Sequence, residues 1–417
     1  MFHRKEDSMK TIVTHIGMLA TPLGRGPRKG RLQGQIQTLR DAWVLMEEGA
    51  VAQVGTGPAP GADQTIDARD RLVTPGLVDA HTHLIFGGWR QHELGMKLRG
   101  ASYLEILAQG GGILSTVSAT RAASQEELAD KAGKALDEML SLGTTTCEAK
   151  SGYGLDVDTE LKQLRAIREL DARHPMDLVP TFLGAHAVPA EHREDRAGYL
   201  RLLCEEAIPA VAAQGLARFC DVFCETGAFT AEESRIVLET GKAHGLIPKI
   251  HADEIDPIGG SVLAGEVGAI SAEHLIVCPP EGIASMARGG TVACLLPATS
   301  LYLGAPFAPA RAMIGAGVPV ALASDFNPGS CPCLNLQLVM TLGCLRYRLV
   351  PEEVLTAVTL NAAAAIGMAE QTGSLEPGKQ ADLVIWDAPD LDHLCYRMGS
   401  DLARTVIKKG RIVSSSD

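Results

Sequence analysis

The stretch Val73-Thr-Pro-Gly-Leu-Val-Asp-Ala-His-Thr-His83 joins a short apolar run to a pair of histidines. An apolar run of this length, bounded by turn-forming residues, is typical of a strand buried on both faces of a parallel sheet. Side chains alternate between the faces of a strand, so His81 and His83 are expected to point the same way. A histidine pair alone is a weak signal, because solvated and core histidines are common.

The same pattern, a short apolar run ending in polar or titratable residues, recurs along the chain. With residues 73–79 as the first, the runs cover 143–148, 178–184, 218–224, 246–251, 268–273, 290–296 and 317–324. The segments between them have helical periodicity, and Ser124-Gln-Glu-Glu127 and Thr230-Ala-Glu-Glu233 are capping boxes that mark helix starts. Strand and helix alternating eight times predict an α/β fold, a (β/α)₈ TIM barrel.

The two ends of the chain have a different texture. Residues 11–54 contain alternating runs punctuated by glycine, and 381–387 and 405–413 have the same character. Such runs predict short antiparallel strands. Neither end is long enough for a stable sheet, so both are expected to pack together as one small β-sandwich domain. The predicted division is 1–72 for its N-terminal part, 73–370 for the barrel and 371–417 for the return.

Several predicted barrel strands end in residues that bind metals or transfer protons. His251 ends the fifth run, His274 follows the sixth and Asp325 follows the eighth. Barrel enzymes keep their active sites at this face, so these side chains are expected to meet His81 and His83 there. Twelve histidines placed at random would seldom do this.

Three imidazoles and a carboxylate, from His81, His83, His251 and Asp325, suit one Zn²⁺ or iron ion (Fe²⁺ or Fe³⁺) per chain. Such an ion lowers the pKa of a bound water to about 7. Hydrolysis also requires proton transfer, for which Glu254 is the candidate acid/base. His274 would orient the water or stabilise a developing oxyanion.

Composition narrows the class of protein further. The net charge of -12 argues against nucleic acid or anionic membrane as a partner, and no apolar run reaches transmembrane length. The ten cysteines lack CxxC or zinc-ribbon spacing, and no secretory signal precedes them. They are expected to be small buried hydrophobes in a reducing cytoplasm. A homodimer is expected only from the general frequency of such assemblies.

The quoted motifs carry a resemblance. Residues 73–83 resemble the entry motif of the amidohydrolase superfamily, and 373–387 resemble its return into the β domain. More specific segments, spread over essentially the whole chain, resemble the imidazolonepropionase family. They are Phe86-Gly-Gly-Trp-Arg90, Gly100-Ala-Ser-Tyr103, Gly110-Gly-Gly-Ile113, Lys150-Ser-Gly-Tyr-Gly-Leu155, Phe182-Leu-Gly-Ala-His-Ala-Val-Pro189, His251-Ala-Asp-Glu254 and Ser324-Asp-Phe-Asn-Pro-Gly-Ser330.

The resemblance implies hydrolysis of the cyclic amide of 4-imidazolone-5-propanoate to N-formimidoyl-L-glutamate, a step of histidine degradation. It also implies metal binding by the four residues named above. The implied contacts to this anionic substrate or its product are Arg90, Tyr103, Tyr153, His186, Glu254, Asn327, Gly329 and Ser330. Arg90 offers a forked, permanently charged donor for the propionate. The resemblance assigns no role to Trp89 or to Cys331 and Cys333.

Other interpretations remain open at this point. A heterocyclic-base deaminase of the same superfamily would share the metal set, although Arg90, Tyr153 and His186 favour a substrate with a carboxylate. A metal-free scaffold would have lost catalysis, and the complete ligand set argues against it. Lys150 follows the second strand, whereas the carboxylated lysine that bridges two metals in some relatives comes from the fourth. One metal is therefore expected, with Glu225 as a weaker second-metal candidate.

Overall fold

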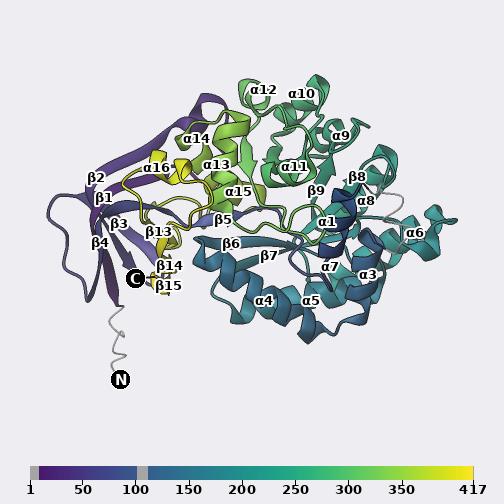
Figure 1. Ribbon diagram of the computed structural model, residues 1–417, viewed down its shortest axis with the longest axis horizontal. Coiled ribbons are helices and arrows are strands. Elements are labelled where there is room, and N and C mark those ends of the chain that lie inside the picture. Colours follow the sequence, from purple (N-terminus) through teal and green to yellow (C-terminus); the bar gives the residue numbers. More distant parts are fainter. Residues whose placement is uncertain (1–8, 101–110, 417) are drawn as a thin grey trace.

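Eight parallel strands form one sheet, which is surrounded by helices on the right of the ribbon diagram (Figure 1). The computed structural model describes residues 9–100 and 111–416. Neighbouring strands follow each other in sequence order, as a singly wound barrel requires. They are β5 (Leu77–Asp79), β6 (Thr144–Lys150), β7 (Asp177–Ala185), β8 (Phe219–Cys224), β9 (Ile247–Ala252), β10 (Ser271–His274), β11 (Val292–Leu295) and β12 (Val320–Leu322). The predicted fold class is confirmed.

Helices connect these strands and cover the sheet (Figure 1). Both predicted capping boxes are present, at the starts of α4 and α8. The helices are α1 (Gln91–Leu98), α3 (Ile113–Ala122), α4 (Gln125–Ser141), α5 (Val157–Arg173), α6 (Arg196–Leu202), α7 (Ile208–Ala213), α8 (Ala231–Ala243), α9 (Gly260–Val267), α10 (Pro280–Gly289), α11 (Pro297–Leu303), α12 (Ala310–Gly315), α13 (Leu336–Tyr347), α14 (Pro351–Ala357), α15 (Leu360–Ala365) and α16 (Leu391–Tyr396). Short 3₁₀ or π turns are η1 (Gly30–Gly34), η2 (Ala190–His192) and η3 (Leu203–Ala207).

One predicted strand is divided between two sheets. Residues 73–79 were expected to form a single barrel strand, but β4 (Gln64–Pro75) belongs to the second sheet and only β5 to the barrel. The chain changes sheets at Gly76, where a Cβ atom would lie 2.3 Å from the Thr145 hydroxyl oxygen. The close approach to Thr145 therefore requires glycine at this crossing.

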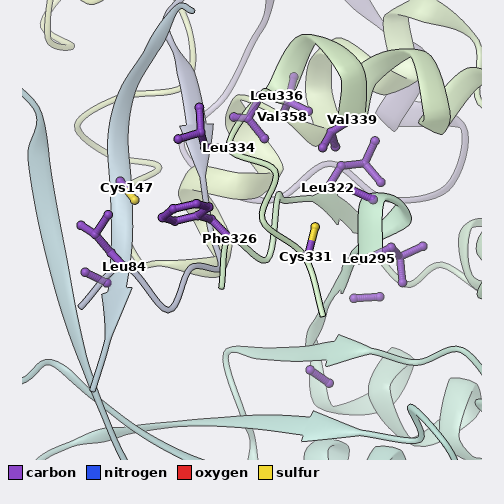
Figure 2. Packing of buried hydrophobic residues seen from close by; sticks show 14 of the residues in the cluster. Leu84, Cys147, Leu295, Leu322, Phe326, Cys331, Leu334, Leu336, Val339 and Val358 are labelled. Atoms are coloured by element: carbon purple, nitrogen blue, oxygen red, sulfur yellow. The ribbon is translucent and has the colours of Figure 1, made fainter. Parts of the chain in front are cut away.

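β5 and β12 are the two edge strands in the order of the eight-stranded sheet. The segments that follow these two strands are hydrogen-bonded to each other, and this contact closes the barrel. Asp325 N–H donates to the His81 carbonyl (3.0 Å), and His83 N–H donates to the Phe326 carbonyl (2.9 Å). Figure 2 shows Phe326 packed beside Leu84 and Cys147 in the hydrophobic core. The segments that carry the predicted ligands are thus part of the barrel wall.

The second sheet, at the left of Figure 1, contains strands from both ends of the chain. Its order is β15 (Arg411–Ser415), β14 (Ala403–Lys408), β13 (Leu383–Trp386), β4, β1 (Lys10–Pro22), β2 (Ile36–Glu47) and β3 (Ala50–Thr56). Side chains from six of these strands form one small hydrophobic core. The predicted antiparallel pairing is confirmed within each end of the chain, in β1–β2, β2–β3, β13–β14 and β14–β15, whereas β1 and β4 pair in parallel. β2 runs opposite to β1 and β3 runs opposite to β2, so β3 has the direction of β1. β4 is the next strand along the chain and runs in that direction too.

The cysteines are all free thiols, and seven of the ten are buried, as expected. Cys331 is fully buried and lies in the loop that follows β12 (Figure 2). Among the described residues, no helix has both the length and the apolar character needed to cross a membrane.

Candidate active site

The predicted metal-binding residues converge at the carboxyl ends of the strands. His81 and His83 follow β5, His251 lies in β9, and Asp325 follows β12. The Asp325 Oδ1 atom lies 3.4 Å from His81 Nε2 and 3.5 Å from His83 Nε2, and His83 Nε2 lies 3.4 Å from His251 Nε2. All four side chains are buried. The structure therefore brings together all four predicted ligands.

The nitrogen and oxygen atoms that meet between these four side chains are suited to bind a cation. Among the described residues, His81 Nε2 and Asp325 Oδ1 are buried without a hydrogen-bond partner. Burial lowers the pKa of His251 to about 3, so its ring is neutral. Its Nδ1 faces Asp221 and carries the proton, which leaves a lone pair on the Nε2 that faces His83. Imidazole nitrogens and a carboxylate oxygen are ligands that zinc and iron accept.

Neighbouring side chains fix the orientation of the ligands. Thr299 Oγ1 donates to Asp325 Oδ2 at 2.7 Å, which leaves Oδ1 for the site. Asp221 lies 3.1 Å from His251 Nδ1. The backbones of Asp325 and His274 are in the left-handed region (φ 57° and 67°), a conformation that non-glycine residues adopt at a cost and that often marks functional sites. Sequence reasoning missed Thr299 and Asp221.

A layer of charged side chains fills the barrel directly below the ligands. Lys150 Nζ lies 2.8 Å from both Glu148 and Asp221, and Lys249 Nζ lies 3.0 Å from Glu148 and 3.3 Å from Glu273. All five are fully buried. The carboxylates raise the pKa of Lys150 against the opposing effect of burial. Lys150 is thus a paired ammonium group, which agrees with the interpretation that it does not bridge two metals.

The side chains of His81, His83, His251 and Asp325 are called the ligand cluster below. Glu254 and His274 lie beside each other at its edge. Glu254 Oε2 is 3.6 Å from His274 Nε2. Burial, and then the charge of Glu225, raises the pKa of Glu254 to about 7. Glu225 itself accepts hydrogen bonds from the backbone N–H groups of residues 226, 254, 255 and 256. Its carboxylate organises this loop and does not face the ligands, which argues against a second metal there.

A cavity of about 510 Å³ opens onto the ligand cluster. Its lining includes His83, His251 and Asp325 together with the predicted acid/base pair. The predicted substrate residues that line it are Arg90, Tyr153, His186, Asn327, Gly329 and Ser330. Tyr103 lies outside the described residues. Such a concave site with a few convergent polar groups is the form that small-molecule sites take.

Arg90 is held at the cavity by two contacts. Its Nε and Nη2 donate to the two oxygens of Glu93 (2.9 and 3.0 Å), and Glu93 also accepts from Gly112 N–H (2.7 Å). A Cβ atom at position 329 would lie 2.2 Å from Arg90 Nη1. Glycine is therefore required at 329 for the guanidinium to hold this position.

His186 and Tyr153 form part of the wall of the cavity. The His186 ring stacks on His83 with centroids 4.9 Å apart, and its Nδ1 lies 2.9 Å from the Gly152 carbonyl. A carbonyl can only accept, so Nδ1 carries the proton. Burial lowers the pKa of His186 to about 4, so Nε2 is an acceptor at neutral pH.

Asn327 organises the loop that follows β12. Its Oδ1 accepts from the backbone N–H groups of Gly329 (2.8 Å) and Ser330 (2.7 Å), and its Nδ2 donates to the Asp325 carbonyl (2.7 Å). The amide is thus largely occupied within its own loop, and it fixes Gly329 against Arg90.

Comparisons with known proteins agree with this geometry. A family model described as the amidohydrolase family matches residues 72–413. Curated proteins called imidazolonepropionase match over nearly the full length. One from Alkaliphilus metalliredigens is 49% identical (96% of this chain, 97% of the relative), and one from Bacillus velezensis is 50% identical (98% and 97%).

Solved structures show the same fold at low sequence identity. A triazine hydrolase variant aligns with a TM-score of 0.74 at 18% identity, covering 97% of this chain and 95% of that one. An adenosine deaminase from Xanthomonas campestris, solved with bound zinc, aligns with a TM-score of 0.70 at 20% identity, covering 97% and 93%. These likenesses concern the fold alone.

Proposed function

The chain belongs to the imidazolonepropionase family of amidohydrolases, and on that premise we propose which of its residues perform the reaction. The reaction is hydrolysis of a cyclic amide C–N bond, which converts 4-imidazolone-5-propanoate to N-formimidoyl-L-glutamate in histidine degradation. The observation that carries the assignment of residues is one cavity lined by Arg90, Glu254 and members of the ligand cluster.

We propose that His81, His83, His251 and Asp325 hold one metal ion, zinc or iron. The unpartnered buried atoms of His81 and Asp325 support this set, because buried polar atoms are otherwise costly. Bound there, the ion would supply a water nucleophile with a lowered pKa and a Lewis acid for the amide oxygen. Asp221 orients His251 through its Nδ1.

We propose Glu254 as the proton carrier. A pKa of about 7 suits a group that must take a proton from water and deliver it to the ring nitrogen that leaves. His274, 3.6 Å away, can stabilise the negative charge that develops on the amide oxygen. Both residues line the cavity beside the ligand cluster.

We propose that the propionate of the substrate binds Arg90, through the Nη N–H groups that do not donate to Glu93. His186 Nε2, an acceptor because Nδ1 donates to Gly152, would receive an N–H of the substrate ring, and Tyr153 packs beside the His186 ring (ring centroids 5.3 Å apart). Ser330 would also contact the substrate, and Asn327 and Gly329, with Tyr153, would hold the formimidoylglutamate product. Tyr103 is kept as a further substrate contact on the basis of the family resemblance.

The location of the protein, its class of partner and its assembly are further parts of the proposal. We propose a cytoplasmic location, which the ten free cysteines support because thiols persist in a reducing compartment. We propose a small anionic molecule as the only class of substrate, and a homodimer as the assembly. The net charge of -12 argues against nucleic acid.

The test is an assay of freshly prepared 4-imidazolone-5-propanoate beside guanine and cytosine, with loss of ring absorbance as the readout. We expect turnover of the imidazolone alone. Turnover of a base with release of ammonia, and none of the imidazolone, would assign the chain to the deaminase alternative.

A further inference from the structure

Lys131, on the face of α4 that meets the segment 86–90, carries a charge that is balanced by no carboxylate of the described residues. Its side chain is half-buried, and within residues 9–100 and 111–416 no ion pair involves it. Its Nζ lies 3.6 Å from the centre of the Phe86 ring and 4.6 Å from that of Trp89, and it donates to the Gly88 carbonyl. Burial lowers the pKa of Lys131 to about 8.

These contacts replace the part of its water that the half-buried ammonium group loses. A cation over an aromatic face is attracted by the ring quadrupole, and the attraction grows as the cation is desolvated. Two rings and one carbonyl therefore stabilise the charge, and all three belong to four consecutive residues of one segment. The same contacts fix that segment, since Lys131 is carried by a helix whose apolar side is packed in the core.

The segment 86–90 is also held from its other side. Trp89 contacts Phe326 edge-on (ring centroids 5.9 Å apart), and Phe326 is buried in the loop after β12. Gly87 N–H donates to Thr120 Oγ1 (2.9 Å). Trp89 remains 47% exposed, so a quencher in solution can reach its ring.

The next residue along the chain is Arg90. Its guanidinium is oriented by Glu93 and Gly329, but the position of its backbone depends on the segment that Lys131 holds. We propose that Lys131 is a positioning residue that fixes segment 86–90 through Phe86, Gly88 and Trp89, and thereby places Arg90 for the substrate carboxylate. This inference rests on the proposed role of Arg90.

The first test is steady-state kinetics of metal-loaded Lys131→Met, which keeps the length of the side chain and removes its charge. We expect KM for the imidazolone to rise roughly 2- to 30-fold, the range given by a cation–π contact, with a much smaller change in kcat. Lys131→Arg keeps a cation that can stack on the rings, so it should restore most of the loss. Lys134→Met is the matched control, because Lys134 lies one turn along the same helix and is exposed.

The second test does not depend on activity. Of the three tryptophans, Trp43 and Trp386 are buried (7% and 0% exposed), so acrylamide quenching of fluorescence reports mainly on Trp89. In metal-loaded protein without substrate, Lys131→Met should raise the quenching constant and shift emission to longer wavelength. Trp89→Phe should abolish the difference between wild type and the Lys131 variant.

The results for Lys131→Met decide the role of Lys131, and the activity of the wild-type protein decides the proposed function. Quenching and KM of Lys131→Met equal to those of Lys134→Met would overturn the inference. A fall in kcat or in metal content with KM unchanged would also overturn it, since that pattern indicates general structural damage. If the wild-type protein does not hydrolyse the imidazolone, the proposed function fails, whereas the quenching experiment still decides whether Lys131 holds Trp89.

Discussion

The backbone N–H of Asp325 donates a hydrogen bond of 3.0 Å to the carbonyl oxygen of His81. His81 follows the first strand of the barrel and Asp325 follows the last, so the hydrogen bond joins the segments at the carboxyl ends of these two strands. Their side chains also approach within 3.4 Å at the ligand cluster. The closure of the barrel and the geometry of the proposed metal site are therefore set by the same pair of residues.

Asp221→Asn should weaken metal binding. The carboxylate orients His251 through Nδ1, and the amide keeps its size but loses its charge. Loss of such a supporting group typically costs about 10- to 100-fold in metal affinity. Competition with a chromogenic chelator measures this directly. Asp382→Asn, a buried carboxylate of the small sheet paired with Lys408, is the control and should leave the affinity unchanged. Equal affinities in wild type and Asp221→Asn would show that His251 needs no such support.

Arg90→Lys should raise KM for the true substrate. Lysine keeps the charge but cannot bind Glu93 and a second carboxylate with a planar fork. A substrate analogue without the propionate should be a poor substrate of wild type and should change little in the variant. An equal loss on both compounds would make Arg90 a structural residue.

Glu254→Gln should lower kcat by about 10²- to 10⁴-fold while metal content is retained, because the amide cannot take a proton. His274→Ala should also lower kcat. The losses of kcat in the two single variants should not add in the double variant, since both residues act on one step. Elemental analysis beside single-turnover kinetics separates lost chemistry from lost metal. Unchanged kcat in the metal-loaded Glu254→Gln variant would assign the proton to another residue, with His274 the first to examine.

The raised pKa of Glu254 adds a pH test of the same prediction. Burial moves this pKa to about 7, so the acid form dominates below that pH and the base form above it. If Glu254 accepts the proton, kcat/KM should fall on acidification with an apparent pKa at or below about 7, because a bound cation favours the ionised form. The acid limb should flatten in Glu254→Gln. An identical limb in both proteins would assign it to a different group.

Gly329→Ala should resemble the loss of Arg90. The added methyl group would lie 2.2 Å from Arg90 Nη1, so the guanidinium must move. KM should rise with little change in metal content, and the effect should shrink when Arg90 is already replaced by lysine. Gly315→Ala, where a Cβ atom meets nothing within 4 Å, is the matched control. Additive effects of the two substitutions would show that Gly329 acts independently of Arg90.

The sequence predicted those parts of the molecule that follow from local periodicity. Short apolar runs separated by segments of helical periodicity were enough to locate the strand regions, and the position of His81, His83, His251 and Asp325 at or after the ends of these runs placed them at one face. The split of residues 73–79 was not predictable, because it depends on the close contact of Gly76 with Thr145, far along the chain.

The contacts among the buried charged residues were likewise not predictable from the sequence. Glu148 and Lys150, and likewise Lys249 and His251, are two residues apart in strands, so the pattern shows that each pair shares a face. It does not show that Lys150 and Lys249 both meet Glu148 inside the barrel. Thr299 and Lys131 lie in helices that carry no local signal of a site, and only the packing reveals their contacts.

The central claim is that hydrolysis depends on one metal ion held by His81, His83, His251 and Asp325. The most direct measurement is titration of zinc or iron into chelator-stripped protein, with metal content and turnover of the imidazolone followed together in wild type and in the His81→Ala, His83→Ala double variant. We predict that wild-type activity is absent without metal and rises to a maximum at about one ion per chain, and that the double variant neither retains metal nor regains activity. Full activity in stripped wild-type protein, or in the double variant, would contradict the claim.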